Sequence, residues 1–247
     1  MSLTAQLAAR GIQLEISSVA HLRPAELDEL HGLANTLMAE SASHFEQHAR
    51  SNDVVHCFRD HHGELLGFQF WRSGDVPNAA TPTRFVLGGK LRIVPAARRR
   101  GLHLVAGLQV LRDEQAAFPH HALVRLANVS VFGFVTMARR LAHYFWLDAA
   151  CDRPELVALT TQLCKQSNFV FDPAHGLVQV GIVMQPATIA AYPASFWDLP
   201  QARAYVARNP AFATNGTYLT MAFDVDELNL RALADGTHAA LCSASQM

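Results

Sequence analysis

The stretch from residue 91 to residue 103 has residue types and a spacing that could bind an anion. It reads Leu91-Arg92-Ile93-Val94-Pro95-Ala96-Ala97-Arg98-Arg99-Arg100-Gly101-Leu102-His103. We interpret it as the end of an apolar strand, a proline that stops the strand, a basic turn and the start of a helix. Backbone N–H groups at a helix N-terminus point into one small volume, and the helix dipole and the three arginines add positive potential. The turn is therefore a candidate pyrophosphate site.

Two polar residues, Asn128 and Ser130, form a second candidate site directly after a short apolar strand predicted over residues 122–127. A helix is predicted from about Val131, because apolar residues recur at helical spacing through Phe145. Both residue types commonly cap helices, and for Ser130 a capping role is the favoured interpretation from the residues alone.

The elements that must position these groups are the strand before the basic turn and the helix after it. The strand is predicted over residues 84–94 and is interrupted by Gly88 and Gly89. Paired glycines inside a strand indicate a β-bulge or a close approach by another group. The helix is amphipathic, with Leu104 and Leu108 on one face.

With this order of elements, the chain resembles the GCN5-related N-acetyltransferases, the GNAT superfamily. Their acyl-CoA signature is a strand ending in Val-x-Pro, followed by [Arg/Gln]-x-x-Gly-x-[Gly/Ala]. Here Ile93-Val94-Pro95 and Arg98-Arg99-Arg100-Gly101-Leu102 fit, whereas His103 replaces the last small residue. The resemblance covers roughly residues 12–147. It implies that the strand over residues 84–94 bulges and splays from its neighbour, and that the pantetheine arm of the cofactor lies in the gap.

The resemblance also assigns residues to the cofactor and implies a fold. The expected acyl-CoA contacts are Leu91, Ile93, Arg98, Arg99, Arg100, Gly101, Leu102 and His103. The expected fold is α/β: a mixed, mostly antiparallel central sheet with a splay between the two central strands and helices on both faces. We expect one enlarged domain over residues 1–247, with a core at about 12–147 and a C-terminal extension at 148–236.

Further elements are predicted from local patterns before and after the signature. The first half should contain a strand at 12–19, a helix from Pro24, a helix or lid within 40–52, and a hairpin of strands 54–58 and 65–71. Beyond Trp146 we expect a helix from Asp152 through Leu163, strands at 169–171, 177–184 and 217–225, a helix at 226–234 and a frayed tail at 237–247.

Composition limits the classes of partner and compartment. The 247 residues carry a formal net charge of −1, so overall charge gives no reason to expect a nucleic-acid partner. No apolar run is long enough to span a bilayer, and Met1 to Gly11 lacks a secretory apolar segment. The four cysteines are scattered and lack a metal-ligand spacing, which favours a reducing cytoplasm and no bound metal.

The function that the resemblance implies is transfer of an acyl group from an acyl-CoA, foremost acetyl-CoA, to an amine of a small molecule. The amine attacks the thioester directly, so proximity and orientation can supply much of the rate. A backbone N–H near Ile93 would hold the developing oxyanion. Many family members protonate the thiolate with a tyrosine seven residues after the asparagine, but that position is Val135 here. Tyr144, expected on the same helix, is too far along it.

The missing tyrosine leaves Asn128 and Ser130 as the predicted catalytic pair. We expect Asn128 to fix the pantetheine arm and Ser130 to stabilise the departing thiolate, or else to cap the helix. No aspartate or glutamate lies on residues 85–94, where a base is often found in the family. Two other functions stay open: an N-acyltransferase that takes its acyl group from an acyl carrier protein, and a non-catalytic protein that binds acyl-CoA. The acceptor and the oligomeric state are not evident from the sequence.

Overall fold

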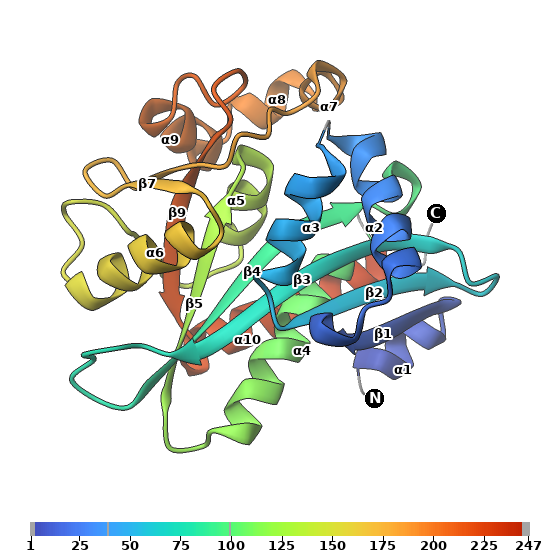
Figure 1. Ribbon diagram of the computed structural model, residues 1–247, viewed down its shortest axis with the longest axis horizontal. Helices are drawn as coiled ribbons and strands as arrows, with labels where there is room; N and C mark the ends of the chain where they lie inside the picture. The colour runs from blue at the N-terminus through green and yellow to red at the C-terminus, as the bar shows by residue number, and fades with distance from the viewer. Residues whose placement is uncertain (1–2, 39, 99, 244–247) are drawn as a thin grey trace.

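The computed structural model describes residues 3–38, 40–98 and 100–243, and these residues form one nine-stranded sheet with helices on both faces (Figure 1). The strand order is β1-β2-β3-β4-β5-β9-β8-β7, and β6 pairs with β9. The strands are β1 (Ile12–Ser18), β2 (Val54–Asp60), β3 (Leu65–Asp75), β4 (Thr83–Ile93), β5 (Ala122–Val129), β6 (Phe145–Trp146), β7 (Val170–Asp172), β8 (Leu177–Gln179) and β9 (Thr217–Asp224). The helices are α1 (Leu3–Ala8), α2 (Pro24–Leu37), α3 (Ala42–Arg50), α4 (Leu102–Ala117), α5 (Val131–Ala138), α6 (Pro154–Gln166), α7 (Pro186–Ala190), α8 (Ala194–Trp197), α9 (Pro200–Arg208) and α10 (Glu227–Ser243).

The sheet is mixed and mostly antiparallel, as the sequence predicted. In the described part of the chain, β4 and β5 are the parallel pair, and the other paired strands run antiparallel. The predicted hairpin of β2 and β3 is present, with Val54 opposite Trp71. Antiparallel neighbours need only short turns, whereas the parallel β4–β5 connection needs a crossover, which α4 supplies.

The helices divide between the two faces of the sheet. In Figure 1, α2, α3 and α6 lie in front of the strands, and α4 and α10 pass behind them. The front face is apolar where Phe45 of α3 packs against Phe68 and Phe70 of β3, with ring centroids 6.0 and 6.1 Å apart. Behind the sheet, Leu102 and Leu108 of α4 join the largest apolar cluster. Each face is therefore closed by its own hydrophobic core.

Two predicted helix boundaries were wrong, and both errors lie near α10. We expected the final helix at 226–234 and a frayed tail, but α10 continues to Ser243, because Thr237 and Leu241 are buried at 1% and 0% exposure and extend its apolar face. The helix from Val131 ends at Ala138 instead of reaching Phe145. Beyond its end, the buried Asn229 side chain accepts hydrogen bonds from the backbone N–H groups of Ala142 and His143 at 2.9 and 3.3 Å.

The extension beyond Leu147 contributes a central strand. β9 lies between β5 and β8, and its residues from Leu219 to Asp224 pair with β5 from Val129 to Val124. Residues 244–247 of the predicted tail lie outside the described residues. The core and the extension are separate in sequence, but their strands lie in one sheet. The expectation of one domain stays a prediction.

Truncation after Leu147 tests that expectation. The shortened chain lacks β9, so the edge of β5 is left unpaired and the main core loses the apolar side chains of Met221 and Phe223. We expect insoluble protein, or a species without a cooperative melting transition, by size-exclusion chromatography and circular dichroism. A soluble, cooperatively folded product would contradict a shared core.

Candidate functional site

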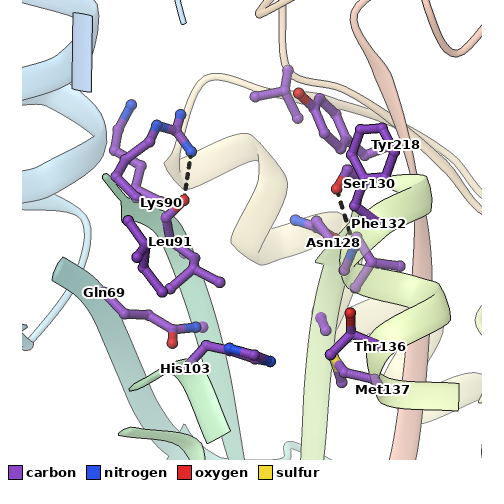
Figure 2. Close-up of a pocket in the computed structure, with 18 of the residues that line it drawn as sticks. Gln69, Lys90, Leu91, His103, Asn128, Ser130, Phe132, Thr136, Met137 and Tyr218 are labelled. Carbon is purple, nitrogen blue, oxygen red and sulfur yellow. Dashed lines mark hydrogen bonds between the residues drawn. The ribbon is translucent and has the colours of Figure 1, made fainter. Parts of the chain in front are cut away.

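The centre of the candidate site is the place where β4 and β5 separate. Their parallel pairing runs from Thr83 opposite Ala122 to Gly88 opposite Ala127 and stops there. Beyond this point a cavity of about 1100 Å³ opens between the strands. Figure 2 shows the two walls, with Lys90 and Leu91 on one side and Asn128 and Ser130 on the other. The predicted splay is confirmed.

A bulge in β4 causes the separation. In the pairing with β3, Gly89 is opposite Phe70 and Arg92 is opposite Phe68, so Lys90 and Leu91 have no register partners. Lys90 has a φ of 40°, in the left-handed region that non-glycine residues rarely adopt. The sequence placed the bulge at Gly88 and Gly89, and the structure places it at the next two residues, Lys90 and Leu91.

The two glycines before the bulge make room for neighbouring side chains. A Cβ atom on Gly88 would lie 2.4 Å from Nη2 of Arg125, and one on Gly89 would lie 3.2 Å from Nε2 of His48. Arg125 is buried over Trp71, with its guanidinium carbon 4.8 Å from the ring centroid. The glycines thus bring a cation and an imidazole against the backbone of β4 at the start of the splay.

The basic turn is only partly arranged as predicted. Arg98 lines the cavity, and its Nε donates to the backbone oxygen of Ile93 at 3.4 Å. Arg100 is exposed and Leu102 is fully buried, and neither is among the cavity-lining residues, so their contacts with the cofactor stay predictions. Arg99 lies outside the described residues.

Gly101 lines the cavity, and its expected contact with the cofactor stays a prediction. A Cβ atom there would meet Cβ of Ala240 on α10 at 3.0 Å, and the residue has a φ of 74°. Glycine is required here by the left-handed backbone and by the packing of α10.

Between the turn and the splay, the cavity passes between α4 and α5. His103 on the first turn of α4 points toward the gap, and Thr136 and Met137 of α5 lie on its other side (Figure 2). Burial lowers the pKa of His103 to about 4, with a smaller contribution from Arg140. The imidazole is therefore neutral at neutral pH, and its Nε2 is buried without a hydrogen-bond partner among the described residues.

Asn128 and Ser130 both line the cavity beside the splay. Oδ1 of Asn128 accepts a hydrogen bond from Oγ1 of Thr220 on β9 at 3.1 Å, which leaves the Nδ2 donor for another partner. Oγ of Ser130 accepts from the backbone N–H of Gly133 at 3.3 Å and is the N-cap of α5. The capping role considered for Ser130 is thus present, and its O–H remains able to donate.

The position of the family's usual acid is apolar in the structure as well. Val135 lines the cavity but cannot donate a proton. Tyr144 lies beyond the end of α5, packs edge-on against Phe134 and Trp146 at 5.5 and 5.8 Å, and is not among the cavity-lining residues. Tyr144 is therefore excluded as the proton donor because it packs away from the cavity, and not because it lies too far along the helix.

A group of charged residues at the bulge was missed by the sequence analysis. Lys90 donates to Oε1 of Glu40, and both side chains are only 1% exposed. Nδ1 of His44 is 2.6 Å from the same oxygen, and Nη2 of Arg92 is 4.0 Å from Oε2 of Glu40. We call Glu40, Lys90 and Arg92 the buried charge cluster. Two cations within a predicted apolar strand were its only sequence signal.

Burial and mutual charge set the ionisation of these groups. Desolvation lowers the pKa of Lys90 to about 8, against the opposing effect of Glu40. For Glu40, desolvation opposes ionisation, but the contacts with Lys90 and His44 outweigh it, so the pKa is lowered. At neutral pH the cluster therefore holds two positive charges and one negative charge.

His48 is a second group that the sequence did not reveal. It comes from α3, lines the cavity beside Gly89, and packs edge-on against Phe169 with ring centroids 4.8 Å apart. Burial, and then the charges of Lys90 and Arg92, lower its pKa well below 6.5. Its Nδ1 is buried and has no hydrogen-bond partner among the described residues. A neutral imidazole thus lies at the bulge.

The far end of the cavity is built by the extension. The side chains that line it there are mostly apolar or aromatic: Phe169, Val180, Ile182, Met184, Tyr192, Phe196 and Tyr218. Tyr192 stacks on Phe132 of α5 with ring centroids 3.8 Å apart. Burial raises the pKa of Tyr218, whose OH donates to the backbone oxygen of Ile182 at 3.2 Å. This end therefore favours an apolar group.

The described residues lack two other kinds of feature. No three histidine, cysteine, aspartate or glutamate side chains gather as a metal site in that part of the chain. In the same part, none of the helices combines the length and apolar character that crossing a membrane requires.

Comparison with known proteins gives matches of fold only. No family model and no curated protein matches the chain. Among solved structures, an acyl-CoA N-acyltransferase from Pseudomonas aeruginosa is 14% identical, with a TM-score of 0.41 over 58% of this chain and 94% of that chain. NAA60 from Arabidopsis thaliana, in complex with acetyl-CoA, is 12% identical, with a TM-score of 0.38 over 86% of this chain and 99% of that chain.

Two other matches span less of the partner protein. The GNAT family N-acetyltransferase YhbS from Escherichia coli, in complex with CoA, is 13% identical, with a TM-score of 0.33 over 47% of this chain and 62% of that chain. A protein from Enterococcus faecalis V583 is covered over 33% of its length, so the chain spans less than two thirds of these two proteins. Likeness at these identities and TM-scores carries no argument about activity or substrate.

The fold can be assigned from the sheet itself. The mixed sheet, the bulge in β4 and the parting of β4 from β5 are the features that the signature at residues 93–102 led us to expect. The turn after β4 leads into α4, and Asn128 at the end of β5 leads into α5, on the two sides of the gap. The chain has the GCN5-related N-acetyltransferase fold.

Proposed function

We propose that this protein transfers an acyl group from an acyl-CoA, foremost acetyl-CoA, to an amine of a small molecule. The observation that carries the proposal is the cavity at the splay, which reaches from Arg98 and His103 through the gap between β4 and β5 to the opposite face of the sheet. Such a passage lets a thioester enter from one face and an acceptor from the other. The two reactants meet in a fixed orientation, which can supply much of the rate.

The donor is held by backbone and by a few polar groups. The pyrophosphate lies at the N-terminus of α4, where the first N–H groups of a helix have no partners within the helix. The pantetheine arm follows β4 past Ile93 and Leu91, both of which line the cavity. Nδ2 of Asn128 donates to an oxygen of the arm, because Thr220 occupies the other end of its amide.

The chemistry is direct attack of the amine on the thioester carbonyl. The N–C bond forms and the C–S bond breaks through a tetrahedral intermediate, whose oxyanion a backbone N–H of β4 stabilises. His48 is neutral and accepts the proton that the amine loses. The hydroxyl of Ser130 donates to the departing thiolate, since Val135 cannot.

Blocking the gap tests donor binding. Thr136→Trp places an indole between α4 and α5, opposite His103. We expect the Kd for CoA in calorimetry to rise about tenfold or more, each factor of ten being roughly 1.4 kcal/mol. Thr161→Trp, on the exposed outer side of α6, is the matched control and should bind CoA like the wild type. Equal affinities in the two variants would place the donor elsewhere.

An assay of thiol release with Thr136→Trp and Thr161→Trp distinguishes an acyl-CoA-dependent enzyme, a carrier-dependent enzyme and a non-catalytic binding protein. Wild type and Thr161→Trp should consume acetyl-CoA when an amine is supplied, and Thr136→Trp should not. Consumption of an acyl carrier protein thioester with none of acetyl-CoA would favour a carrier-dependent enzyme. CoA binding without consumption of either donor would favour a binding protein and reject acyl transfer.

His48→Gln tests the base. Loss of a general base lowers rates by roughly 10²–10⁴-fold, and we expect kcat to fall by about 10². In the wild type, kcat should decline only at a pH well below 6.5, where the lowered pKa of His48 lets the imidazole take up a proton. The variant should lack this acidic decline, and the exposed control His120→Gln should keep it. An unchanged pH profile in His48→Gln would reject the role.

Ser130→Ala separates capping from proton donation. Loss of an N-cap costs about 1 kcal/mol, so the melting temperature should fall. Ser41 caps α3 in the same way, accepting from His44 N–H at 3.3 Å, and is not among the cavity-lining residues. Ser41→Ala should lose similar stability and keep kcat, whereas Ser130→Ala should also lose kcat. Equal kcat in the two variants would limit Ser130 to capping.

A further inference from the structure

The cavity meets two separate basic regions, and they lie on opposite faces of the sheet. The turn around Arg98 leads into α4, behind the sheet in Figure 1. Arg92 is opposite Phe68 in the β3–β4 pairing, and Phe68 packs in the core under α2 and α3, in front of the sheet. Paired residues of adjacent strands share a face. The cation at Arg92 is therefore on the face away from the cofactor's pyrophosphate.

The buried charge cluster has one positive charge in excess. Lys90 and Arg92 are 1% and 11% exposed, and Glu40, at 1%, is their ion-pair partner among the described residues. Oε1 of Glu40 accepts from Lys90 and lies 2.6 Å from Nδ1 of His44, whereas its Oε2 has no hydrogen-bond partner among the described residues and is 4.0 Å from Nη2 of Arg92. One carboxylate therefore faces two cations. A buried charge without compensation is costly, and the usual remedy is a counter-ion.

The guanidinium of Arg92, a cavity-lining residue, has donors without hydrogen-bond partners among the described residues. Its Nη1 donates to the backbone oxygen of Leu91 at 3.0 Å, and its Nη2 is 4.0 Å from Glu40, beyond hydrogen-bond distance. Its Nε is buried with no hydrogen-bond partner among the described residues. Nε and Nη2 form a planar fork that suits two oxygens of one carboxylate.

We propose that the acceptor is an amino carboxylate, whose carboxylate binds Arg92 and whose amine reaches the thioester at the bulge. This rests on the proposed acyl transfer and names its acceptor class. One carboxylate balances the single excess charge, and the mostly apolar lining around Phe169 and Ile182 fits an apolar side chain.

The test compares matched pairs that differ only by the carboxylate. Phenylalanine with 2-phenylethylamine, and leucine with 3-methylbutylamine, are titrated by calorimetry into the protein alone and into the protein saturated with CoA. We expect each amino acid to bind roughly tenfold to a hundredfold more tightly than its amine, the range expected for charge-assisted hydrogen bonds.

Arg92→Gln should reduce this ratio to about one, and Arg92→Lys should retain part of it, because lysine keeps the charge without the fork. Arg203→Gln, an exposed change on α9, is the matched control and should leave the ratio unchanged. A structural defect in Arg92→Gln would weaken both members of a pair, whereas loss of a carboxylate contact weakens the acid alone. CoA affinity of the variant should match that of the wild type.

The outcomes distinguish this inference from the proposed function. Wild type that consumes acetyl-CoA equally with both members of each pair would keep acyl transfer and overturn the amino carboxylate. A wild-type binding ratio near one, or an unchanged ratio in Arg92→Gln, would overturn it too. A high ratio that depends on Arg92, in a protein that consumes no thioester, would support the carboxylate site and reject acyl transfer.

Discussion

In β4, two residues without partners turn the end of the strand away from β5, and the rest of the site depends on that bulge. Parallel pairing satisfies the backbone only as far as Gly88 and Ala127. Past them, backbone groups of Leu91 and Ile93 border a cavity instead of a neighbouring strand. Buried backbone groups need partners, so this edge is suited to a ligand that itself carries amides. The same divergence opens a passage between the two faces of the sheet.

The charges beside the bulge are a poor way to stabilise a fold. Taking Glu40 and Lys90 out of water costs several kcal/mol per ion, and apolar residues of similar size often serve stability as well or better. The cluster also contains Arg92, whose charge the single carboxylate cannot balance. A feature that costs stability and lines a cavity is better explained by ligand recognition than by packing. Burial, and then the charges of Lys90 and Arg92, lower the pKa of His48, so under the proposed function the cluster would act on both the acceptor and the base.

Local pattern was enough to predict most of the central sheet, because alternation and turn residues set strands such as 54–58 and 65–71. The signature at residues 93–102 predicted the splay. The cluster at the bulge could not be predicted, since Glu40 and Lys90 are 50 residues apart and only the tertiary fold joins them. The length of α10 was missed because Thr237 has a weak helical preference, and its burial, which favours the helix there, depends on the tertiary fold. The turn at Gly101 was predicted, but the close packing of this residue against Ala240 was not, because that contact depends on the position of α10.

The extension shapes the chemistry as well as the size of the cavity. β9 pairs with β5 along the segment that ends at the splay, and its Thr220 fixes the amide of Asn128. Two residues earlier in β9, Tyr218 lines the cavity's far end with its OH tied to the backbone of Ile182. β9 therefore joins the extension to the sheet and also orients one wall of the site. A change in the extension that shifted β9 would move the amide of Asn128 and the apolar end of the cavity together, because Thr220 and Tyr218 are on the same strand.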